Sequence, residues 1–201
     1  MISDIIAITS SGENLHTALD LYRRVAAYSD LSRKGTLHLR LLAEEMLSMM
    51  RTITGEVSGR FWIEAEEDEY KLHLLVNAAL TKEKREELLN TSSSGKNEAT
   101  RSFMGRIRDF FFRGVDEEIA AYNPSVLGAG AVSSSGFRPV TDWEWSLLRY
   151  QDTLSVLKAQ EPEAAEAWDE LEKSVVSRVA DDVKVSIKGF ETEMTITKKL
   201  V

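Results

Sequence analysis

The amino-acid sequence predicts an α/β two-layer sandwich, in which helices cover one face of a mixed, mostly antiparallel sheet. Three observations predict this fold. Apolar residues recur at helical spacing over residues 32–53, and apolar and polar residues alternate over residues 61–77. A second alternating stretch, residues 183–200, closes the chain. We expect its last strand, residues 191–200, to pair inside the sheet.

The first part of the chain predicts one strand and two helices. Residues 5–8 are apolar and indicate a short strand. Ser10 and Glu13 form a capping-box pattern, which places a helix over residues 13–28. The stripe of apolar residues at 32–53 predicts a second, longer helix. We expect both helices to pack on the same face of the sheet.

The middle of the chain predicts a hairpin followed by helices. Residues 61–65 and 70–76 read as two strands, and the acidic residues 66–69 form the turn between them. Residues 81–89 and 100–113 have the spacing of two further helices. Together with the terminal hairpin, these segments outline one domain.

A helical insertion is predicted before the last hairpin. It covers residues 115–180 and divides the core of the domain into residues 1–114 and 181–201. Residues 123–139 are rich in Gly, Ser and Ala, which is typical of a flexible loop. The rest of the insertion predicts two helices, at residues 142–159 and 162–180.

Composition excludes several classes of function. The 201 residues include no cysteine, so thiol nucleophiles, disulfides and thiolate metal sites are excluded. A formal net charge of -8 argues against a nucleic-acid-binding protein. No apolar run is long enough for a membrane span and the first residues do not form a signal peptide, so we expect a cytoplasmic protein with no membrane partner. His16, His38 and His73 are isolated in the sequence, and we predict no metal site.

The segment at residues 41–50, LLAEEMLSMM, resembles the nucleotide-binding helix of the GHKL ATPase superfamily, which includes DNA gyrase, histidine kinases and anti-sigma factor kinases. In that family the helix carries a Glu, two apolar residues, a small residue and an Asn. The hairpin at residues 61–77 is similar to the pair that leads into the family's adenine-binding D-x-G-x-G. Residues 189–200 are similar to its closing G-x-x-x-x-h-x-h pattern. The resemblance therefore implies a GHKL ATPase-like sandwich.

Carried over residue by residue, the resemblance makes Glu45 the family Glu, which in catalytic members positions or activates the attacking group. The Asn that holds Mg²⁺ in the family falls at Met49, whose thioether is a poor ligand for a hard cation. The Asp that binds the adenine amino group falls at Asn77, which lacks the charge. The two glycines that follow it fall at Ala79 and Thr81. These departures predict weak or absent nucleotide binding.

The region that corresponds to the family's lid supplies further candidates for phosphate contact. They are two glycines and two cations, namely Gly95, Lys96, Gly105 and Arg106. With Asn77, they complete the candidate nucleotide-binding set.

A purely structural interpretation stays open for these features. Glu45 is also explained as a helix-surface carboxylate, and Asn77 as a turn residue. Met46, Met49 and Met50 fit the role of core residues, and the arginines near Arg106 fit a solvated helix face.

Three hypotheses follow. The first is a degenerate GHKL ATPase-like regulatory or interaction protein, not an enzyme, whose partner is another protein or a second copy. The alternative is an active ATP-binding switch or anti-sigma-type serine kinase, with ATP and Mg²⁺ as cofactors. A second alternative is a structural dimer that presents the Gly/Ser-rich loop.

Overall fold

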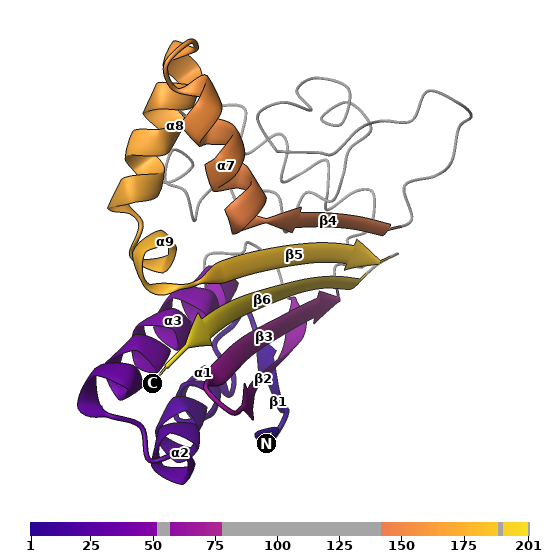
Figure 1. The fold of residues 1–201 in the computed structure, drawn as a ribbon. Helices are drawn as coiled ribbons and strands as arrows, with labels where there is room; N and C mark the ends of the chain where they lie inside the picture. The colour runs from indigo at the N-terminus through magenta and orange to yellow at the C-terminus, as the bar shows by residue number, and fades with distance from the viewer. Residues whose placement is uncertain (52–56, 78–141, 189–190, 201) are drawn as a thin grey trace.

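A six-stranded antiparallel sheet organises the chain (Figure 1). The computed structural model describes residues 1–51, 57–77, 142–188 and 191–200. The strand order is β1-β2-β3-β6-β5-β4, and every neighbouring pair is antiparallel. The expectation of a mixed sheet is therefore wrong for the described residues. The strands are β1 (Ile6–Thr9), β2 (Ser58–Glu66), β3 (Glu69–Asn77), β4 (Asp142–Ser146), β5 (Asp182–Lys188) and β6 (Glu191–Lys199).

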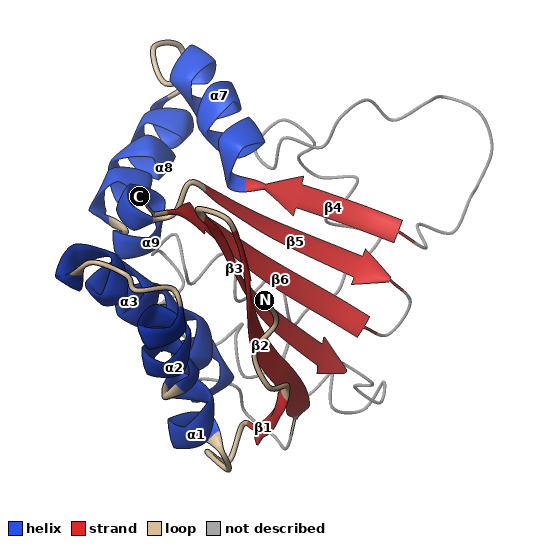
Figure 2. Cartoon of the chain, turned by 60° about the horizontal axis from the view of Figure 1, so that its bottom comes forward, coloured by secondary structure: helices blue, strands red, loops and turns tan. Residues whose placement is uncertain are grey.

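Helices form the second layer, on one side of the sheet (Figure 2). The first three lie over β1, β2 and β3, whereas α7 packs against β4 and β5. The predicted α/β sandwich with its first helices on a common face is thus confirmed. The described helices are α1 (Leu15–Leu19), α2 (Leu21–Tyr28), α3 (Arg33–Arg51), α7 (Leu147–Leu157), α8 (Pro162–Lys173) and α9 (Val175–Val179).

The hydrophobic core lies between these two layers. Alternate residues of β2 are buried, as the period-two pattern predicts for a strand with one covered face. Helix α3 contributes the apolar stripe that the sequence shows, with Leu42, Met46 and Met50 fully buried. On the face of the sheet that packs against the helices, a row of directly paired residues crosses four strands. These residues are Phe61, Leu74, Met194 and Val185.

Strand β6 lies in the interior of the sheet, between β3 and β5. Leu72 pairs with Ile196, and Ile196 pairs in turn with Val183. The prediction that the terminal strand is enclosed by the sheet is therefore confirmed.

The first predicted helix differs from the structure in two ways. It divides at Asp20 into α1 and α2. The capping box is also wrong, because the Ser10 hydroxyl accepts a hydrogen bond from the Val57 amide (3.0 Å) instead of capping the helix. Asn14 stands at the N-cap position with φ of 57° and no side-chain cap. Its amide donates to the Ala7 carbonyl, 3.0 Å away, and so ties the helix to β1.

The insertion is not purely helical. The expectation of a helix from residue 142 is wrong at its start, because residues 142–146 form β4 and pair with β5. Ser146 then begins α7, accepting a hydrogen bond from the Arg149 amide (3.3 Å). The last predicted helix is interrupted at Ser174, which separates α8 from α9. The predicted helices at 81–89 and 100–113 and the loop at 123–139 lie outside the described residues.

Candidate functional site

Glu45 lies on α3, on the border between its buried and exposed faces. Burial raises the pKa of the Glu45 carboxyl, and the adjacent Glu44 raises it further. Glu44 is itself paired with Arg40, at 2.8 Å. In the described part of the chain, Glu45 has no ion-pair partner of its own. This carboxyl therefore retains its proton more readily than an ordinary glutamate.

Met49 follows Glu45 by about one helical turn, and the sequence resemblance predicts a loss of the metal-holding Asn at this position. Its side chain is only 4% exposed and belongs to the hydrophobic core. Met46 and Met50 are fully buried in the same cluster. The interpretation of these methionines as core residues is confirmed.

The C-terminal end of α3 meets the ends of two strands at Gly59. A methyl group at Gly59 would lie 3.4 Å from Val76 and 3.5 Å from the terminal carbon of Met50. Asn77 follows Val76 directly, ends β3 and pairs with Glu191. The structure thus brings the helix of Glu45 and the strand of Asn77 to the same end of the sheet.

The candidate residues from the predicted lid cannot be compared with the position of Glu45 and Asn77. Gly95, Lys96, Gly105 and Arg106 lie outside the described residues, as do Ala79 and Thr81. In the ranges that the structure describes, no group of three or more His, Asp or Glu side chains is arranged to hold a metal ion. None of the helices in those ranges combines the length and apolar character needed to cross a membrane.

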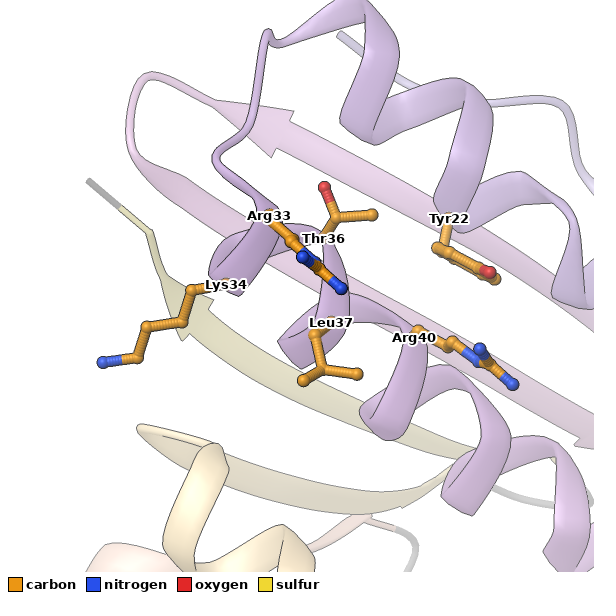
Figure 3. Close-up of a pocket in the computed structure, with 6 residues that line it drawn as sticks. All are labelled: Tyr22, Arg33, Lys34, Thr36, Leu37 and Arg40. Atoms are coloured by element: carbon orange, nitrogen blue, oxygen red, sulfur yellow. The ribbon is translucent and has the colours of Figure 1, made fainter.

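A different surface lies at the other end of α3, which the sequence interpretation missed (Figure 3). It is an open depression of about 740 Å³ between α2 and the first turns of α3. The depression ends at Arg40, about 13 Å along the helix axis before Met49. We call it the α2–α3 groove. It is lined by Tyr22, Arg33, Lys34, Thr36, Leu37 and Arg40.

The α2–α3 groove has a strongly basic lining. Arg33 and Lys34 are exposed, and neither has a carboxylate within ion-pair distance among the described residues. Arg40 is held by Glu44, and this hydrogen bond raises the pKa of the Arg40 guanidinium. The sequence did contain a signal, because residues 21–43 hold five Arg and Lys residues and a single acid, Asp30, in a chain of net charge -8.

A third polar cluster lies on the face of the sheet away from the helices. The Nδ1 atom of His73 lies 3.0 Å from Glu193 Oε1 and 3.2 Å from the hydroxyl of Thr195. Its Nε2 atom is 3.6 Å from Glu64, which is too far for a hydrogen bond. The indole of Trp62 donates to Glu64 at 3.1 Å. This cluster joins β2, β3 and β6 through side chains that the sequence left without a role.

No protein-family model, curated protein or solved structure matches this chain.

Proposed function

We propose that this chain is a cytoplasmic regulatory or protein-interaction protein. Its scaffold resembles that of the GHKL ATPase superfamily, and its nucleotide binding is weak or lost. The partner is another protein or a second copy. The contact surface includes the end of the sheet near Glu45 and Asn77, with Lys96 and Arg106 as further candidates from the sequence.

Met49 is the observation that carries the proposal. The resemblance puts the Mg²⁺-holding Asn at this position, yet the side chain is buried in the core. Mg²⁺ prefers hard oxygen ligands, and a thioether sulfur is only a weak acceptor. Without an oxygen ligand from α3, a Mg²⁺–ATP complex loses one of the contacts that the resemblance implies.

The strand order supports the scaffold part of the proposal. Helix α3 packs on the β2–β3 hairpin, and the terminal hairpin pairs beside β3, so the segments that carry the resemblance are neighbours. Function depends on the side chains of a site rather than on the fold, so the substitutions decide between the hypotheses.

Glu45 favours the second candidate, an ATP-binding switch or an anti-sigma-type serine kinase. A half-buried carboxyl with a raised pKa is suited to accept a proton from an attacking hydroxyl near neutral pH. In this alternative, Glu45 is the base that orients the reacting group, and Asn77 contacts the adenine.

The structural-dimer alternative is favoured by exposed apolar side chains on α7. Leu148 is 50% exposed and Val156 is 67% exposed. Sedimentation equilibrium tests it, because a dimer should dissociate on substitution of Leu148→Glu together with Val156→Glu.

Thermal unfolding with ATP tests the leading proposal. A ligand at about a hundred times its dissociation constant stabilises a protein by about 2.7 kcal/mol, or roughly 5–10 °C in a chain of this size. We expect a shift below about 2 °C at millimolar ATP with Mg²⁺. A shift several times larger that disappears when the metal is chelated would refute the proposal in favour of the kinase or switch.

A double substitution shows what remains of the pocket. Met49→Asn with Asn77→Asp introduces the amide and the carboxylate of the family. Met46→Asn with Asn77→Asp is the matched control, because it buries the same amide on the same helix away from the metal position. ATP binding by the first variant alone shows that the pocket keeps its shape and lacks only these groups. Equal behaviour of both variants shows that the pocket itself has been lost.

A further inference from the structure

We propose that the α2–α3 groove binds an acidic amphipathic helix of a partner protein, one that carries an aliphatic residue between two carboxylates. The groove extends along α3 from Arg33 to Arg40, which lies about 7.5 Å along the helix axis before Glu45, and none of its lining residues belongs to the candidate nucleotide-binding set. The proposal therefore goes beyond the function proposed above.

The floor of the groove offers apolar surface to such a helix. Leu37 is 50% exposed, although it is a large aliphatic side chain on a well-packed helix. Tyr22 of α2 lines the same groove, near Arg40 in Figure 3, and is only 5% exposed, so its ring forms a fixed wall. A leucine or similar side chain of the partner would cover the exposed Leu37.

The charges around the floor select an acidic partner. Arg33 and Lys34 are exposed without a carboxylate partner among the described residues, so they are available to an incoming carboxylate. The chain as a whole carries a net charge of -8. A local excess of positive charge on such a chain both steers an acidic segment and fixes its position.

The spacing along α3 favours a helix over a compact anion. Arg33, Leu37 and Arg40 follow the i, i+4, i+7 pattern and so lie on one face of α3. Arg33 and Arg40 are about 10 Å apart along the helix axis. In Figure 3 the side chains of Arg33, Lys34 and Arg40 do not converge on one point, as donors to a single phosphate would. Carboxylates two turns apart on a partner helix, with an aliphatic residue between them, match this arrangement, one at Arg33 and one at the Nη atoms of Arg40, whose Nε donates to Glu44.

Two contacts of Arg23 hold Tyr22 in place at the groove. The Tyr22 hydroxyl accepts a hydrogen bond from Arg23 Nε at 3.0 Å. Arg23 is held in turn by Asp20, at 3.0 Å. The wall of the groove is therefore arranged before any partner arrives, which lowers the entropic cost of binding.

Fluorescence anisotropy with a designed peptide tests the proposal on the full chain. The probe is a labelled alanine-based helix with two glutamates seven residues apart and a leucine between them. We expect saturable binding that weakens with salt, as contacts between exposed charges do. Replacing the peptide leucine by serine should weaken binding by about fivefold or more, because the apolar contact is lost.

Charge reversal in the groove is compared with an equal charge change elsewhere. Arg33→Glu with Lys34→Glu should weaken peptide binding by at least about tenfold. The matched control is Arg149→Glu with Lys173→Glu, which alters two exposed cations on α7 and α8 and should change binding by less than about twofold. Equal losses in both variants, or no binding by the parent chain, would overturn the proposal.

Two further outcomes would assign the groove to another occupant. Tighter binding of an oligonucleotide or inorganic phosphate than of the peptide would overturn the choice of an acidic helix. Self-association that is lost only in the Arg33→Glu, Lys34→Glu variant would assign the groove to a second copy. Repeating the titration with Mg²⁺–ATP separates the two proposals, since peptide binding should be unchanged whatever the thermal-shift result.

Discussion

The indole of Trp62 and the imidazole of His73 stack on the face of the sheet away from the described helices, with ring centroids 4.7 Å apart and planes 2° from parallel. The two residues are directly opposite each other on β2 and β3. His73 is 8% exposed even though it lies on the face away from the helices, and Glu193 of β6 holds its Nδ1 atom. This face of the sheet therefore carries a fixed cluster of side chains on β2, β3 and β6.

Trp62 and His73 should stabilise the sheet jointly. In a double-mutant cycle of Trp62→Leu and His73→Thr, we expect a coupling free energy of about 0.5–1 kcal/mol, because stacked cross-strand pairs contribute this much. Urea unfolding of the four proteins measures it. The control cycle pairs Trp62→Leu with Thr197→Ala on β6, where the coupling should be near zero. Equal coupling in both cycles would contradict a specific stack.

Gly59→Ala should destabilise the protein. An added methyl group would lie 2.9 Å from the Leu75 carbonyl oxygen, so the backbone of β3 must shift. We expect a loss of about 1–3 kcal/mol in the free energy of unfolding, as for other overpacked sites. Ser58→Ala, at the exposed neighbouring position, is the control. A stabilisation in place of the loss would mean that the space above Gly59 is larger than the structure shows.

Asp182→Ala should weaken the junction between the sheet and α7. The buried carboxylate of Asp182 accepts hydrogen bonds from the amides of Val183 (2.8 Å) and Leu148 (3.3 Å). Its removal leaves two amides without these partners, so we expect a loss of about 1–3 kcal/mol in urea unfolding. Asp152→Ala, on the exposed side of α7, should change stability by less than about 0.5 kcal/mol.

Glu45→Gln should raise the melting temperature at neutral pH. Because the folded-state pKa of Glu45 lies above its unfolded value, the charged form is disfavoured by folding. The penalty is present above the folded-state pKa and disappears as pH falls below the unfolded value, near 4.3. We expect a rise of about 1–2 °C at pH 7 and no difference below about pH 4. A rise that persists in acid would show that the charge of Glu45 is not its cause.

Local patterns in the sequence predict much of the sheet and of α3. The alternation around Trp62 and around Val185 is long enough to define the covered face, and the stripe from Leu39 to Met50 defines one long helix. The edge strand β4 was missed because its alternation covers only five residues and runs directly into the helical spacing after Ser146. Its strand conformation depends on pairing with β5, which is far away in the sequence.

The candidate site was predictable only in part. The buried position of Met49 was predicted by its interpretation as a core residue, whereas the half-burial of Glu45 goes beyond its interpretation as a helix-surface carboxylate. The α2–α3 groove depends on α2, with Tyr22, lying next to the first turns of α3. The spacing of apolar residues within one helix does not predict its contact with another helix. The sequence signal for the α2–α3 groove was the excess of Arg and Lys over acidic residues in the segment 21–43.

The central position of β6 sets the order in which the protein can be completed during synthesis. Glu69 pairs with Lys199 and Asn77 with Glu191, so every rung of the β3–β6 ladder joins residues more than a hundred positions apart. The ribosome releases β1, β2, β3 and the first helices long before β6 exists. Until then β3 is an unpaired edge with free backbone donors and acceptors, which is the kind of strand that recruits other chains. Closure of so long a loop is also slow. A nascent chain of this protein should therefore need protection of the β3 edge until its last strand has emerged.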